Sequence, residues 1–147
     1  MTTAKALLRG IAVCCFALLP SLALSQQGAI DNGIQRVVSN CMTAAHNGDS
    51  AACVALVDAL IAEWTAAGED ASALARDIAA LDIALVDAAR AARLEPAQLS
   101  VIADAIDESA RLDPDPGQAS NLLAVAADVR SGVLDFPVPE RIQASAN

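Results

Sequence analysis

The chain has 147 residues, with 18 acidic residues against nine lysines and arginines and a formal net charge of −9. Phosphate repels a chain this acidic, so its charge argues against nucleic acid and anionic membrane surfaces as partners. Two phenylalanines, one tryptophan and no tyrosine leave a core of aliphatic residues, which favours packed helices over a sheet. The length fits a single domain.

The first 25 residues have the organisation of a Sec signal peptide. Lys5 and Arg9 precede an apolar run over residues 11–24, and Ala23 and Ser25 are the small residues of a cleavage site. The run is shorter than the ~20 residues that span a bilayer, and a proline interrupts it. The sequence therefore predicts a signal peptide over residues 1–25 and an exported protein, periplasmic or secreted, with no membrane segment after cleavage. Cleavage removes two basic residues and no acid, so the mature net charge becomes −11.

Hydrophobic periodicity and turn residues divide residues 26–131 into helical segments. We expect helices over residues 30–46, 50–67, 70–93, 95–112 and 115–131. Gly68 is expected to end the second helix in the left-handed conformation. Asp115 followed by Gln118 has the spacing of a capping box at the start of the fifth. The predicted fold class is all-α, a single-domain antiparallel bundle of four to five helices.

The C-terminal segment, residues 132–147, is predicted to be an extended tail. It contains Phe136, Pro137, Val138 and Pro139, and its prolines favour polyproline geometry. We expect this tail to lie along the bundle or to fray at its end.

Cys41 and Cys53 lie symmetrically about Asn47, the centre of the first predicted turn, and each lies on the apolar stripe of its helix. In an oxidising compartment such a pair is expected to form a disulfide that bridges the first helical hairpin. Closing this loop would contribute ~3 kcal/mol to stability. A redox pair usually has Cys-x-x-Cys spacing, and a metal site needs more ligands than these cysteines and His46 supply. We therefore predict no metal and no cofactor.

A helical hairpin bridged by Cys41 and Cys53 resembles the disulfide-linked helix pairs of bacterial cysteine-rich repeat proteins. It is also similar to the small periplasmic immunity proteins of the type VI secretion system, which are disulfide-containing helical bundles. Both resemblances rest on these two cysteines alone. The second implies an inhibitor that acts in the periplasm.

Two charged residues interrupt the apolar faces of their helices. Asp82 falls in the middle of the apolar arc of the third predicted helix, and Arg130 falls between Leu123 and Ala126 on the fifth. Because a lone buried carboxylate is costly, we expect Asp82 to be at least half buried and paired with an arginine, with Arg130 as first choice. The alternative is that Asp82 lines a ligand-binding cleft that stays wet.

Other polar candidates have simpler interpretations. Asp104, Asp107 and Glu108 share one face of the fourth predicted helix with Arg111, which is typical of a solvated surface. His46 is expected to contact the negative end of the first helix dipole.

Trp64 continues the apolar stripe of the second predicted helix, so core packing is expected, with an exposed interaction anchor as the alternative. No motif pairs a nucleophile with a base. The sequence therefore predicts a non-catalytic exported binding protein whose partner is a protein or a small ligand. One alternative is a periplasmic immunity or inhibitor protein against a toxin or hydrolase. The other is a small enzyme that uses Asp82 in a cleft.

Overall fold

The computed structural model describes residues 20–138 and residue 142, and this part of the chain contains five helices and no strand. The helices are α1 (Pro20–Asn47), α2 (Ser50–Ala66), α3 (Ala71–Ala92), α4 (Pro96–Leu112) and α5 (Pro116–Arg130). The predicted all-α bundle is confirmed. Most of the predicted signal peptide lies outside the described residues, and α1 begins inside it.

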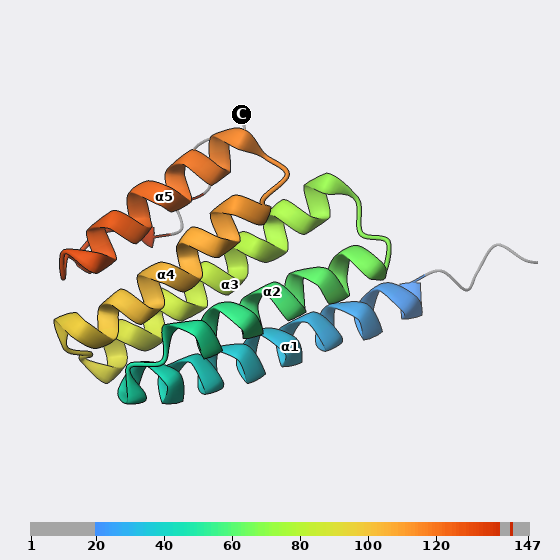
Figure 1. The fold of residues 1–147 in the computed structure, drawn as a ribbon. Helices are drawn as coiled ribbons and strands as arrows, with labels where there is room; N and C mark the ends of the chain where they lie inside the picture. Colours follow the sequence, from blue (N-terminus) through green and yellow to red (C-terminus); the bar gives the residue numbers. More distant parts are fainter. Residues whose placement is uncertain (1–19, 139–141, 143–147) are drawn as a thin grey trace, which may run out of the picture.

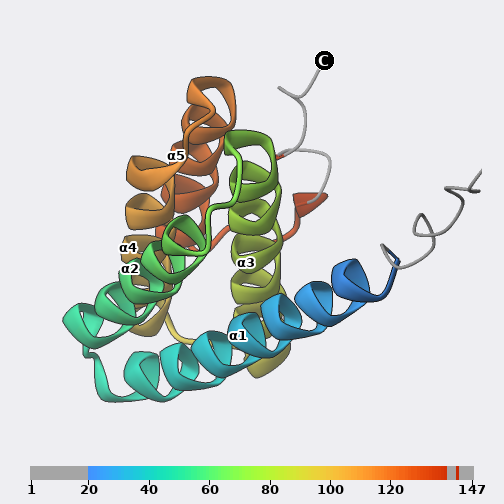
Figure 2. The same ribbon diagram turned by 90° about the vertical axis from the view of Figure 1, so that its right-hand side faces the viewer.

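The helices are arranged as two antiparallel hairpins and a covering helix. The hairpin of α1 and α2 lies beside the hairpin of α4 and α5, with α2 next to α4 (Figure 1). The helix between them in sequence, α3, lies behind this layer and contacts each of the other four. The start of α1 projects beyond the other helices when the molecule is turned (Figure 2).

The turns follow local sequence signals. Asp49 accepts the backbone N–H of Ala52 at 3.0 Å before α2, and Asp70 accepts that of Ala73 at 2.9 Å before α3. Gly68 follows α2 with a φ of 84°, the left-handed conformation predicted for it. Side-chain caps and short turns therefore set the direction of each following helix.

The capping box predicted at the start of α5 forms only in part. Asp115 accepts the backbone N–H of Gln118 at 3.1 Å. The Gln118 amide does not return this contact, because it donates to the Ala75 carbonyl at 2.5 Å and to Asp113 at 2.6 Å. Gln118 thus ties the start of α5 to α3, a contact between helices that the local spacing does not reveal.

The core consists of aliphatic side chains from all five helices. The largest of its fully buried residues in these helices are Ile78, Leu81, Leu85, Ile102, Ile106 and Leu122. Burial of each such side chain contributes roughly 1.5–3 kcal/mol.

The described part of the C-terminal tail lies along the bundle. Arg90 donates to the Leu134 carbonyl at 2.6 Å and to the Phe136 carbonyl at 3.2 Å, which holds the chain against α3. Val138 and residue Ile142 are helical and buried in the core. The expected polyproline geometry therefore fails at Val138, which is helical and packed in the core. Pro139 lies outside the described residues.

Candidate functional site

The disulfide between Cys41 and Cys53 joins α1 to α2, as predicted, and brings their Cα atoms to 4.7 Å. Both cysteines are 0% exposed, inside the apolar core. A thiol-exchange partner cannot reach sulfur atoms buried in this way. The bridge therefore stabilises the hairpin and is not placed for redox exchange.

Asp82 lies inside the molecule on α3 and is 0% exposed. Neither carboxyl oxygen has a hydrogen-bond partner among the described residues. Burial raises the pKa of Asp82 well above its usual range, and the charge of Asp113 raises it further. Ser109 donates to the Ala105 carbonyl at 3.2 Å rather than to the carboxyl group. The interior therefore favours Asp82 as a neutral acid.

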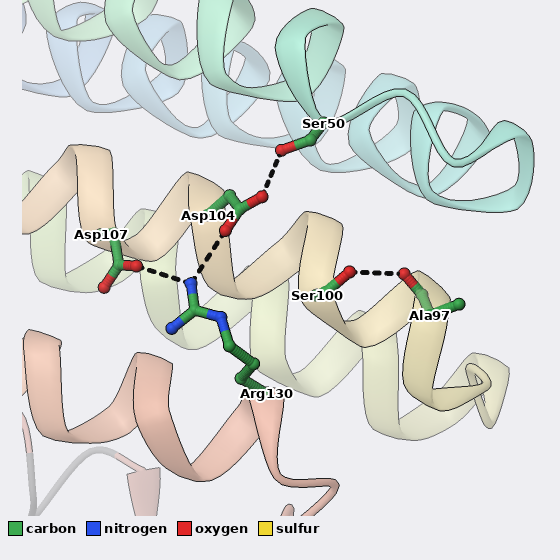
Figure 3. Close-up of polar contacts among 6 residues, drawn as sticks. All are labelled: Ser50, Ala97, Ser100, Asp104, Asp107 and Arg130. Carbon is green, nitrogen blue, oxygen red and sulfur yellow. Dashed lines mark hydrogen bonds and ion pairs between the residues drawn. The ribbon is translucent and has the colours of Figure 1, made fainter.

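The predicted ion pair between Asp82 and Arg130 is wrong. The Arg130 side chain is 42% exposed and donates to Asp104 at 2.8 Å and to Asp107 at 2.6 Å (Figure 3). The reason is the rotation of α5. Leu123, which the apolar arc places inside, is 51% exposed, so Arg130 lies at the edge of the helix that faces α4.

Asp104 connects three helices. Ser50, the first residue of α2, donates its hydroxyl to Asp104 at 2.5 Å, and Arg130 of α5 donates to the other carboxylate oxygen (Figure 3). Partial burial alone would raise the pKa of Asp104, but the hydrogen bonds from Ser50 and Arg130 and the arginine charge outweigh it and lower the pKa. Ser50, Asp104, Asp107 and Arg130 are called the polar junction below.

The expected solvated face of α4 is therefore correct only in part. Asp104 and Asp107 face neighbouring helices, whereas Glu108 forms an ion pair with Arg111 on their own helix. A hydrogen bond from Arg111 lowers the pKa of Glu108 despite partial burial. The polar junction is an arrangement for holding helices together, with each carboxylate already occupied by a protein donor.

His46 bridges α1 and α4. Its Nδ1 lies 3.0 Å from the amide nitrogen of Gln98, whose oxygen accepts the backbone N–H of Glu95 at 2.9 Å. Since the amide nitrogen can only donate, Nδ1 is the acceptor and carries no proton in this contact. His46 therefore has a partner on another helix besides the predicted dipole contact.

Trp64 is 4% exposed, so its predicted core packing is correct and it is not an exposed anchor. Its side chain nevertheless lines an open groove between α1 and α2, with a volume of about 360 Å³. The lining residues, called the α1–α2 groove below, are Ala29, Ile30, Asn32, Gly33, Arg36, Leu60, Glu63, Trp64 and Ala67.

The floor of the α1–α2 groove is apolar and its rim is charged. Arg36 and Glu63 form an ion pair at 3.5 Å across the groove, with side chains 63% and 68% exposed. Gly33 lets Leu60 pack closely against α1, because a Cβ at residue 33 would lie only 2.9 Å from Leu60 Cδ1. Sequence analysis missed this groove, since it depends on how closely two helices approach each other.

Two carboxyl groups lie together where the turn after α2 meets α3. Asp77 is 3% exposed, and Arg76 contacts one of its oxygens at 3.3 Å. Burial raises the pKa of Glu69, and the adjacent Asp77 carboxyl raises it further. Sequence analysis missed this pair, although two acids on either side of a predicted helix start were a possible signal.

Among residues 20–138 and 142, no group of three or more His, Cys, Asp or Glu side chains is placed to hold a metal ion. No helix of the described chain is long and apolar enough to cross a membrane. No protein-family model matches the chain, and comparison with curated proteins and with solved structures finds no significant match.

Proposed function

We propose that the protein is a non-catalytic, exported binding protein and that the α1–α2 groove is its binding site. The observation that carries this proposal is the groove itself. Ile30, Leu60 and Trp64 line it with apolar surface, and an exposed ion pair between Arg36 and Glu63 borders it. Binding sites combine an apolar lining with a few polar groups that fix orientation in this way.

Export is supported by two features of the chain. Residues 1–25 have a basic start, an apolar run and a small-residue cleavage site. The disulfide between Cys41 and Cys53 is compatible with an oxidising compartment. We therefore propose a periplasmic or secreted location.

Charge favours a basic partner. The predicted mature chain has a net charge of −11, which attracts cations over long distances. In the groove, Glu63 is 68% exposed, so a cation on the partner can compete with Arg36 for it. We propose a segment with an apolar face and positive charge, such as a cationic amphipathic helix. An immunity or inhibitor protein that binds such a segment of a toxin or hydrolase would be one form of this function.

The alternative of an enzyme that uses Asp82 has less support. The carboxyl group is 0% exposed, so a substrate could reach it only after α3 had moved away from its neighbours. General acid or base catalysis requires hydrogen-bond reach of the substrate.

Trp64 allows a direct test, because it is the single tryptophan of the chain and lines the groove. The probe is a synthetic amphipathic peptide of leucine and lysine, with a leucine–glutamate peptide as its charge control. We expect saturable changes in Trp64 fluorescence with the lysine peptide alone, weakened by added salt.

Two variants test whether binding occurs in the groove. Ala67→Phe should fill the groove and weaken binding of the lysine peptide about tenfold or more, which corresponds to ~1.4 kcal/mol. Ala66→Phe adds the same side chain at a neighbouring exposed position outside the groove and should leave affinity unchanged. Equal affinities for the two variants, or no saturable signal with either peptide, would overturn the proposed site.

A further inference from the structure

The turn after α2 borders the α1–α2 groove and is closed by two acids. The Glu69 backbone N–H donates to the Trp64 carbonyl at 3.4 Å, and both Trp64 and Ala67 line the groove. The Glu69 side chain reaches from this turn to Asp77, on the second turn of α3. Movement of Glu69 would therefore disturb the wall of the groove.

Each of these two carboxyl groups has one buried oxygen without a partner. Glu69 Oε2 and Asp77 Oδ2 are both buried, and neither has a hydrogen-bond partner among the described residues. Two carboxylates cannot hydrogen-bond to each other, since neither carries a hydrogen, and their charges repel. One proton placed between the two oxygens satisfies both of them at once.

We propose that a proton held by Glu69 is donated to the Asp77 carboxylate and closes the turn between α2 and α3, and that loss of this proton loosens the turn and the groove wall. The groups that face the pair define its surroundings. Arg76 contacts Asp77 from the same helix and favours ionisation, whereas the charge of Asp70 opposes it. The effect on ligand binding rests on the proposed function, but the closure of the turn does not.

The direction of the pH effect follows from the raised pKa of Glu69. The folded protein holds its proton more tightly than the unfolded chain does, so this contribution to stability is complete in acid and is lost as the pH rises. The turn should therefore be closed in mildly acidic solution and looser in alkaline solution.

The first measurement uses the protein without any ligand. Between about pH 5 and about pH 8, hydrogen-exchange protection of the Glu69 amide, corrected for intrinsic exchange, should fall by about tenfold for each pKa unit gained on folding. Trp64 fluorescence should change over the same range. Glu69→Gln should abolish both responses, because its amide donates to Asp77 at every pH.

Two further variants keep the test decisive. Asp77→Asn should also flatten the response, because its amide donates to Glu69, and it covers the case in which Glu69→Gln fails to fold. Glu95→Gln removes an acid at the distant start of α4 and should titrate like the wild type. An unchanged pH response in Glu69→Gln and Asp77→Asn, or no response in the wild type, would overturn the proton-sharing pair.

Binding is measured separately with the leucine–lysine peptide. Its affinity for the wild type should fall between about pH 5 and about pH 8, and its affinity for Glu69→Gln should stay constant. A pH response of the turn without any peptide binding would support the pair and contradict the proposed function. Peptide binding by a protein whose turn shows no pH response would support the proposed function and contradict the carboxyl pair.

Discussion

The polar junction and the buried face of α3 differ in how they accommodate carboxyl groups. At the junction, Asp104 and Asp107 share Arg130, and these side chains are 38–42% exposed. Inside the bundle, Asp82 is 0% exposed and neither oxygen has a partner within the described chain. A carboxylate stays ionised where donors and water remain, and becomes a neutral acid where both are absent.

This difference gives the two regions opposite pH dependence. Asp82 has a raised pKa, so its contribution to stability is complete below the ordinary aspartate pKa and is lost as the pH rises through the folded-state value. Asp104 has a lowered pKa, so its contribution is present above the ordinary value and is lost as the pH falls through the folded-state value. Alkali therefore weakens the interior of α3, and acid weakens the polar junction.

The largest expected effect comes from making Asp82 permanently neutral. Asp82→Asn should be more stable than the wild type by about 1–3 kcal/mol near pH 8, because the folded wild type must either hold a proton that the unfolded chain releases or bury a charge without a partner. Below the ordinary aspartate pKa the two proteins should have similar free energies of unfolding. Urea denaturation over a series of pH values measures this difference.

Asp87→Asn is the matched control for Asp82→Asn. It makes the same chemical change on the same helix, but at an exposed residue that pairs with Arg90. Its effect should stay within about 0.5 kcal/mol at every pH. A wild type that is more stable than Asp82→Asn near pH 8 would show that Asp82 finds a cationic partner or water.

Removing the cation of the polar junction should have a smaller effect of opposite sign. Arg130→Met keeps most of the aliphatic stem but leaves Asp104 and Asp107 facing each other without a counter-charge. We expect a loss of about 1 kcal/mol near pH 7 that shrinks in high salt, since the site is partly exposed.

Arg36→Met provides the comparison for Arg130→Met. Arg36 forms a single exposed ion pair with Glu63 at 3.5 Å, so its replacement should change stability by less than about 0.5 kcal/mol. Equal losses in the two variants would mean that the polar junction stabilises the bundle no more than an ordinary surface pair does.

The sequence predicts helix ends well wherever a cap or breaker lies close by. Pro96 and Leu112 bound α4 as expected, and Gly68 follows α2 in the left-handed conformation. The Cys41–Cys53 bridge was also predictable from local sequence, because one short turn brings the two cysteines to the same level of the helical hairpin. These features depend on neighbours in sequence.

The partners of charged residues depended instead on how distant helices pack. An apolar face of α5 that includes Leu123 places Arg130 in the interior, yet Leu123 is 51% exposed. The polar junction needs α2 beside α4, with the intervening helix α3 behind them (Figure 1). The spacing of Asp104 and Asp107 indicates a polar cluster on one helix face, but it does not identify the residue that contacts them. The α1–α2 groove likewise required the approach of Gly33 to Leu60.

A finer comparison lies within the polar junction. Asp104 accepts from both Ser50 and Arg130, whereas its neighbour in the junction, Asp107, accepts from Arg130. Asp104→Asn should lower stability by roughly 0.5–1 kcal/mol near pH 7, and Asp107→Asn by less. The deficit of Asp104→Asn should diminish as the pH falls, because the wild-type carboxylate is then protonated too. Thermal unfolding at two pH values distinguishes the variants, and a larger loss for Asp107→Asn would contradict the role given to Ser50.

The smallest expected effect isolates the contact between α2 and α4. Ser50→Ala removes the hydroxyl that donates to Asp104 at 2.5 Å without altering any charge. Combined with Asp104→Asn in a double-mutant cycle, it should give a coupling energy of about 0.5 kcal/mol or more, since the two groups are in contact. A parallel cycle of Ser50→Ala with Asp107→Asn should give a coupling near zero, because Ser50 contacts Asp104 in the junction (Figure 3). Equal coupling energies in both cycles would mean that Ser50 affects Asp104 and Asp107 alike through the local electrostatic field. The hydrogen bond from Ser50 would then not be a specific polar contact between α2 and α4.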